Sequence, residues 1–441
     1  MNFNKNSSWL MLHLVVTLFM ASEAKAQLPS VDVQKELFIT DLGVVNSVEA
    51  TTPTGAFHVK TLFEAMAPTG HGAKDVMLSL LTSFRNDSLD LPKRTIDEVI
   101  LNPWKRWEVG ATSPLPITAA PPSDADWDVN WEKAPFRLLA IVNRMDLRHN
   151  PTIGQAGEGR FVFGMIDPVS GAPLSFTFIF EYVQPIASAS DIEAVALRWH
   201  SLGNIPAFNQ DYIDALKAIT LTFAGNDAVP ARPNGSSIGQ IRSNEIALND
   251  FSDPLGAGWE LREWRLKSHD GLFEPDTVKE TPPSSLNDSP FLGFLLDRFG
   301  VGLSEQIPNE MLGFRGITAF SPDFQWEVPG VALNDLRLRR FSVHTCSGCH
   351  GGDGKTGDGT SFLHVTNRIV SQEAKLSRFL TGVSASATQV VDPASGELKS
   401  IYSDLDIRKL DFQTLISTDP GIRAFANQLI EEIQIRRSRV H

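Results

Sequence analysis

The only two cysteines of the chain stand three positions apart, and a histidine follows the second one directly. Cys346, Cys349 and His350 form the pattern C-x-x-C-H. Two thiols at this spacing can reach two vinyl groups on one edge of a porphyrin, and the histidine can then bind the iron from the proximal side. The pattern therefore predicts one covalently bound haem c, with both cysteines as attachment sites and His350 as an iron ligand.

Two other chemistries could use the same thiols. A zinc ion could be held by Cys346 and Cys349 together with His344 or His350, with His364 as the distant fourth ligand. A disulfide between the two cysteines is the simpler alternative in an oxidising compartment. The glycine-rich stretch that follows has neither the P-loop nor the EF-hand spacing. Haem remains the favoured interpretation, and the zinc or disulfide clasp of a secreted binding or surface protein stays open as the alternative.

The stretch "RRFSVHTCSGCHGGDGKTG" resembles the haem-attachment segment of small cytochrome c domains. Those domains commonly show a phenylalanine, a few residues, C-x-x-C-H-G and a glycine-rich loop. The resemblance covers about 100 residues at the C-terminus. It implies thioether bonds at Cys346 and Cys349, His350 as the proximal ligand, and one-electron transfer to a redox partner that the sequence does not identify.

A looser resemblance extends over the whole chain. The segments "PFRLLAIVNRMDLR", "GEGRFVFG" and "RSNEIAL" are similar to those of uncharacterised exported bacterial proteins. Such proteins pair an α+β region with a C-terminal C-x-x-C-H segment, so the resemblance implies this organisation and no known activity.

The sixth ligand of the expected iron is predicted to be His364. Many cytochromes c supply a methionine downstream of C-x-x-C-H, but no methionine follows residue 350 in this chain. Two histidine ligands would give a lower reduction potential than methionine and histidine. An open sixth position would instead suggest peroxide or small-gas chemistry. Met145, Met165 and Met311 could replace His364 only by reaching the haem from the large region.

The region before the cysteines carries charged residues on or beside apolar stretches. These could form a polar pocket, although structural ion pairs are the simpler interpretation. They are Arg144, Asp146, Arg148, Glu158, Arg160, Arg242 and Glu245. His200 follows Trp199 on a predicted helix and is expected to be structural. No Gly-x-Ser-x-Gly or His-Glu-x-x-His pattern occurs, so hydrolase machinery is not visible and catalytic residues cannot be assigned.

Hydrophobic patterning predicts an α+β fold with an antiparallel sheet. β-branched and aromatic residues separated by glycine and proline predict a meander over 136–147, 159–167 and 174–183, and alternation predicts strands at 238–248 and 259–266. Ser190 and Glu193 fit the capping box of a helix start. The expected helices are 57–67, 73–84, 190–202, 210–223, 289–299, 373–383 and 420–437.

The N-terminus has the features of a secretory signal peptide over residues 1–26. Lys5 precedes a short apolar run, and Ala24-Lys25-Ala26 fits a cleavage site. The expected mature protein is periplasmic or secreted, without a stable membrane anchor. Its domains are predicted as an α+β domain of unknown function over 27–335 and a small α-helical cytochrome c-like domain over 336–441.

Composition excludes some partners. The net charge is −13 and no basic block occurs, which argues against binding to nucleic acid or to anionic membranes. Apolar residues make up 42% of the chain, enough for substantial cores.

Overall fold

The computed structural model describes most of the chain from residue 28 onward. The predicted signal peptide lies outside the described residues, as do His344, Cys349 and His350. Across the described part, no helix is both long and apolar enough to cross a bilayer. The described residues are 28–441 except 88–90, 149–154, 189, 247, 249–256, 280, 299–306, 320–325, 333–334, 336, 339–340, 342–344, 348–362, 382–389, 392–397, 400–403, 422 and 425–441.

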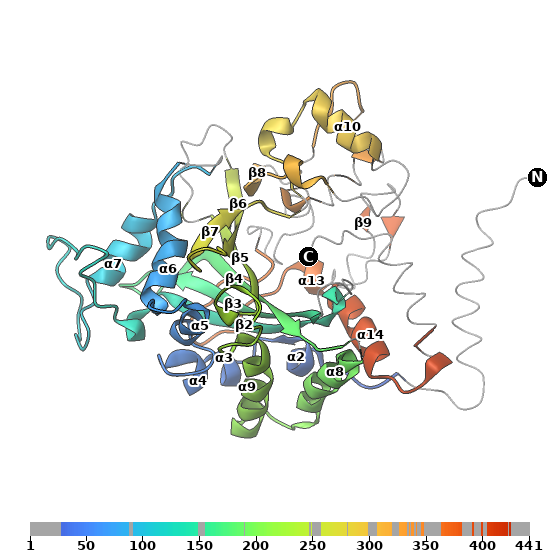
Figure 1. Ribbon diagram of the computed structural model, residues 1–441, viewed down its shortest axis with the longest axis horizontal. Helices are drawn as coiled ribbons and strands as arrows, with labels where there is room; N and C mark the ends of the chain where they lie inside the picture. Colours follow the sequence, from blue (N-terminus) through green and yellow to red (C-terminus); the bar gives the residue numbers. More distant parts are fainter. Residues whose placement is uncertain are drawn as a thin grey trace, which may run out of the picture.

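An eight-stranded antiparallel sheet forms the centre of the molecule (Figure 1). Neighbouring strands pair in chain order from β1 to β7, and β8 also pairs with β6. The expected mixed α+β fold with an antiparallel meander is therefore confirmed. The strands are β1 (Phe38–Ile39), β2 (Phe136–Arg144), β3 (Gln155–Ile166), β4 (Pro173–Pro185), β5 (Ile238–Glu245), β6 (Ala257–Leu266), β7 (Phe273–Asp276) and β8 (Arg315–Ala319).

The two faces of this sheet have different covers because side chains alternate along each strand. One face, here called the helix face, carries Phe161, Phe178 and Ile241 into a large apolar core. The other, here called the cavity face, carries Val142 and Val162 into a smaller core built with residues from the C-terminal third of the chain. A register shift between Leu138 and Ala140 changes the alternation in β2 and bends the ladder there.

The helices expected before residue 300 are all present. Figure 1 shows α8 and α9 on one side of β2 to β5, and α14 lies beside α8. The helices are α2 (Val33–Glu36), α3 (Leu42–Val45), α4 (Val48–Thr51), α5 (Val59–Met66), α6 (Ala73–Thr82), α7 (Asn102–Lys105), α8 (Asp191–Ser201), α9 (Gln210–Ala224), α10 (Pro290–Arg298), α13 (Arg378–Thr381) and α14 (Asp404–Ile416).

Two local predictions are wrong. Ser190 at the start of α8 has helical backbone angles and makes no side-chain cap, so the capping box does not form. The Asp191 carboxylate accepts from the Ser188 N–H at 2.8 Å instead. The helix expected over 373–383 begins only at Arg378, as α13, because Leu376 forms a β-bridge with Val365 and keeps the preceding residues extended; its expected last two residues lie outside the described residues.

Residues 363–381, here called the cover segment, lie against the cavity face. Asn367 donates to the main-chain oxygens of Met165 and Leu174, where the pairing of β3 and β4 is irregular. The Arg368 guanidinium donates twice to the Leu138 oxygen, at 3.2 and 2.9 Å, beside the bulge in β2. These two side chains therefore bind the cover segment to the sheet at positions where the strand pairing is irregular.

Candidate functional site

A cavity opens on the cavity face of the sheet, between the strands and the C-terminal third of the chain. Its apolar wall comes from β1 to β4, β6 and the cover segment, and its polar wall is mainly arginine. The lining residues are Phe38, Val142, Arg144, Arg160, Val162, Ile179, Glu181, Arg242, Asn244, Leu261, Cys346, His364, Val365, Leu380 and Arg408. The cavity therefore combines a thiol, an imidazole and four guanidinium groups beside an apolar surface.

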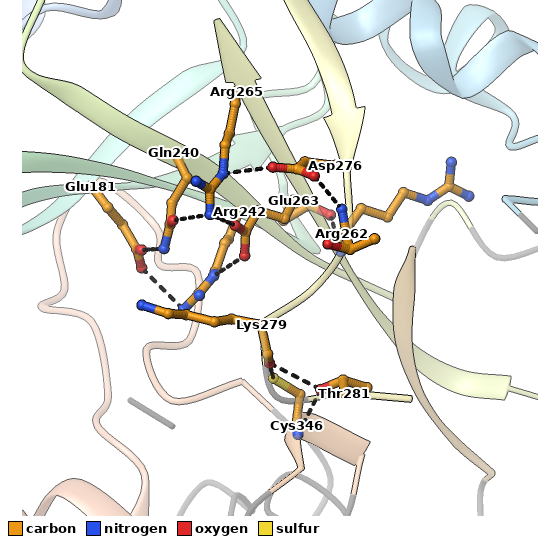
Figure 2. Close-up of polar contacts among 12 residues, drawn as sticks. Glu181, Gln240, Arg242, Arg262, Glu263, Arg265, Asp276, Lys279, Thr281 and Cys346 are labelled. Carbon is orange, nitrogen blue, oxygen red and sulfur yellow. Dashed lines mark hydrogen bonds and ion pairs between the residues drawn. The ribbon is translucent and has the colours of Figure 1, made fainter. Parts of the chain in front are cut away.

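Cys346 is fixed at this cavity by its neighbours. Its side chain is buried and packs with Trp259 and Leu261 of β6. Figure 2 shows the Cys346 N–H donating to Thr281 Oγ1, at 3.1 Å, and Sγ lying 3.9 Å from the Lys279 oxygen. Burial raises the pKa of the thiol. Because only the thiolate is a strong nucleophile, a buried thiol with a raised pKa is weakly reactive. The position of Cys346 therefore favours a structural or attachment role over thiolate catalysis.

His364 lines the same cavity from the cover segment. Its Nδ1 lies 3.0 Å from Ser377 Oγ, and its main-chain oxygen accepts from the Ser377 N–H at 2.9 Å. If Nδ1 donates to this hydroxyl, Nε2 carries the lone pair that a metal ligand requires. The structure thus brings together Cys346 and His364, two of the residues that the sequence predicts for the iron site. Cys349 and His350 lie outside the described residues.

The sulfur ligands considered as alternatives lie elsewhere. Met145 and Met165 are buried in the core of the helix face, on the side of the sheet away from the cavity. Met311 packs against a separate cluster that includes Trp326 and Phe341. None of the three lines the described cavity. His364 is therefore better placed than these methionines to bind a metal beside Cys346.

Three of the charged residues that the sequence singles out line the cavity, and each is ion-paired. Arg144 contacts Asp146 at 2.8 Å, and Arg160 contacts Glu158 at 2.6 Å. Arg242 lies between Glu263, at 3.0 Å, and Glu181, at 3.7 Å (Figure 2). The pocket and the ion pairs, which the sequence poses as alternatives, are thus features of one site.

Arg408 of α14 completes the polar wall, and sequence reasoning missed it. Its guanidinium contacts Asp404 at 2.5 Å. Burial and the nearby Arg144 lower the pKa of Arg408 to about 10. Burial alone would also lower the pKa of Arg144, but Asp146 outweighs that effect and raises it. Arg144 and Arg408 together outweigh the burial of Asp146 and lower its pKa to about 2. All three groups are therefore charged at neutral pH.

The remaining residues singled out from the sequence belong to structural pairs. Arg148 binds Asp411 of α14, with one N–O distance of 2.8 Å. His200 Nδ1 lies 2.7 Å from Glu36, which ties α8 to α2. Glu245 belongs to a second group of buried charges on the helix face. This group, here called the enclosed cluster, consists of Arg94, Glu245, Glu260, Arg262 and Arg315.

The donor set fits a haem, whereas the enclosed space is small. Thiol, imidazole and apolar side chains are what a covalent haem requires, and arginines suit its carboxylates. The cavity has a volume of about 70 Å³. Such a volume has room for a few water molecules. It therefore matches the polar edge of a haem or a small anion, and not a whole porphyrin.

Neither the metal-site geometry nor similarity to other proteins assigns the site. Within the described residues, no group of three or more His, Cys, Asp or Glu side chains is arranged to hold a metal ion. No protein-family model, curated protein or solved structure matches this chain.

Proposed function

We propose that this protein carries one covalent haem c, attached through Cys346 and Cys349 with His350 as a ligand, and transfers electrons through it. The sequence pattern identifies the attachment sites. The observation that carries the proposal is the meeting of Cys346 and His364 at one cavity, although 17 residues separate them in the chain. A bound haem c would supply a one-electron couple, and the chain would set its potential and exposure.

The residues around the cavity have distinct roles in this proposal. His364 would be a further protein ligand of the iron, and Ser377 would hold its imidazole in orientation through Nδ1. Val162, Ile179 and Leu261 would shield the site from water, which influences the potential. The four arginines would neutralise acidic groups of the cofactor. The α+β region would thus be part of the haem site and also a docking or substrate-oxidising module.

The alternative is a secreted binding or surface protein in which the same cysteines form a disulfide or zinc clasp. The burial of Cys346 suits such a clasp, because it limits access of reductants to the sulfur. The cavity with its arginines would then have no role in the clasp. Metal analysis and thiol titration of the purified protein distinguish the two forms of the alternative from each other and from the haem protein.

Attachment can be tested by export of the full chain from cells that express the cytochrome c maturation machinery. Haem should remain on the chain through denaturing electrophoresis, since thioether bonds survive unfolding. Cys346→Ala with Cys349→Ala should abolish the haem signal. A chain that carries no haem-derived mass under these conditions would overturn the proposal, and bound zinc or a protected thiol pair would favour the clasp.

A further inference from the structure

The polar wall of the cavity has an excess of positive charge. Among the residues that the structure describes, its charged lining consists of Arg144, Arg160, Arg242, Arg408 and one acid, Glu181. The other carboxylates that pair with these arginines, such as Asp146 and Asp404, do not line the cavity. A ligand inside therefore meets mainly guanidinium groups. Glu181 at the wall contacts Arg160 at 3.1 Å and Arg242 at 3.7 Å, whereas the carboxylates that pair with Arg144 and Arg408 lie outside the lining.

Arg408 can donate a further hydrogen bond. The residue is 5% exposed, and within the described part of the chain its Nε has no hydrogen-bond partner. A buried donor without a partner destabilises the folded state, and a charged donor does so more strongly. An acceptor entering the cavity would remove this cost. The lowered pKa of Arg408, caused by burial and by Arg144, is consistent with a cation that lacks sufficient negative charge nearby.

We infer that this cavity binds a carboxylate group, with Arg408 as its main donor and Arg144 and Arg160 as supporting cations. The planar guanidinium fork matches a carboxylate in two parallel hydrogen bonds. The apolar neighbours Val142, Val162 and Val365 exclude water and strengthen the attraction. The enclosed space admits a carboxylate with a short apolar stem and nothing much larger.

Such a carboxylate has two possible sources. It can be a propionate of the haem, in which case the inference rests on the function proposed above. It can also be a free small carboxylic acid, and then it is independent of the haem. The recognising chemistry is the same in both cases, so the site can be tested first in a chain without haem.

The test uses the full-length Cys346→Ala, Cys349→Ala chain and acetate as the probe. Acetate replaces chloride at constant ionic strength, and thermal unfolding is followed, because a ligand that binds the folded state raises Tm with concentration. We expect acetate to raise Tm relative to chloride. Arg408→Gln should weaken the apparent affinity about tenfold or more, since hydrogen bonds to charged groups contribute about 1.5–3 kcal/mol. Arg198→Gln, a matched change at an exposed arginine of α8, should leave it unchanged.

If Arg408→Gln does not fold, Arg408→Lys provides the second variant. It keeps the charge but loses Nε and the planar fork, so it should also weaken acetate binding several-fold. The same titration of the haem-carrying chain identifies the source. Loss of the acetate effect means that a propionate fills the site, and its persistence means a free acid; both results support the inference. Equal Tm in acetate and chloride without haem, or full acetate affinity in an Arg408 variant that folds, would overturn it.

Discussion

Two clusters of buried arginines lie on opposite faces of one sheet, and they differ in what surrounds them. In the enclosed cluster, Glu260 contacts Arg262 at 2.6 Å and Arg315 at 3.1 Å, and every member is at most 6% exposed. The arginines of the cavity face border empty space. Because alternate side chains of a strand point to opposite faces, Arg242 and Glu245 of the same strand belong to different clusters.

This difference separates structural from binding charges. The enclosed cluster ties the loop that holds Arg94 to β5, β6 and β8 through ion pairs between buried side chains, and Ser243 and the Phe84 ring also contact it. Substitutions in the enclosed cluster should therefore lower the free energy of unfolding and leave ligand binding unchanged. Substitutions in the cluster on the cavity face should change ligand binding more than stability, since its arginines border the cavity and carboxylate partners such as Glu158 are partly exposed.

The largest expected effect is the loss of one partner from the enclosed cluster. Glu260→Gln leaves Arg262 and Arg315 without their closest carboxylate, and breaking such a buried pair costs about 3–5 kcal/mol. Glu158→Gln removes a partly exposed partner of Arg160 and should cost less than about 1 kcal/mol. Urea unfolding followed by circular dichroism gives both values. Equal losses would mean that the two clusters do not differ as described.

The pH dependence of stability should also come from the enclosed cluster. Burial, opposed in part by Arg262, raises the pKa of Glu245 from 4.5 to about 7. Between these values the folded state holds a proton that the unfolded state has lost, so stability falls as pH rises through this window. The loss should reach about 3 kcal/mol above pH 7. Between pH 5 and pH 8, wild type should lose about 2 to 3 kcal/mol through this group, and Glu245→Gln should lack this loss. An unchanged pH dependence in Glu245→Gln would contradict the assignment.

A smaller effect is expected where the cover segment meets the sheet. Arg368→Met removes hydrogen bonds to the oxygens of Leu138 and Val45 and should cost about 2 kcal/mol. Arg137→Met is the matched control, because Arg137 is less buried and, among the described residues, its side chain bonds two main-chain oxygens, those of Arg368 and Gly171. It should cost about half as much. If Arg368→Met left the unfolding midpoint unchanged, the cover segment would not be integral to the cavity face.

The sequence predicted the strands whose residues are aromatic and β-branched, and it missed those that depend on a neighbour. β7 is "FEPD" and β8 is "RGITA", and both exist because β6 offers them a free edge. Strand propensity of this kind is set by pairing, which the local sequence does not reveal. α14 was missed because its buried residues, which include Arg408 and Asp411, lie all around the helix and give no apolar stripe.

The sequence also predicted some residues of the candidate site and missed others. Cys346 and His364 could be identified because their chemistry is rare and their spacing is local. Arg408 could not, since only the fold brings it to Arg144 across more than 260 residues of chain. The alternation of charged and apolar residues in β5 and β6 did predict two faces. It could not show that both faces would carry buried charges, or that the charges of one face would line the cavity described above.

The most direct test of the account is the spectrum of the ferric protein with and without His364. We expect covalent haem in a low-spin state with two histidine ligands and no long-wavelength band of a methionine–iron bond. His364→Ala should make the iron high-spin and able to bind cyanide or carbon monoxide. His269→Ala, at a side chain that is 72% exposed, should leave the spectrum unchanged. A wild-type spectrum that is already high-spin, shows methionine ligation, or is unaffected by His364→Ala would contradict the site described for Cys346 and His364.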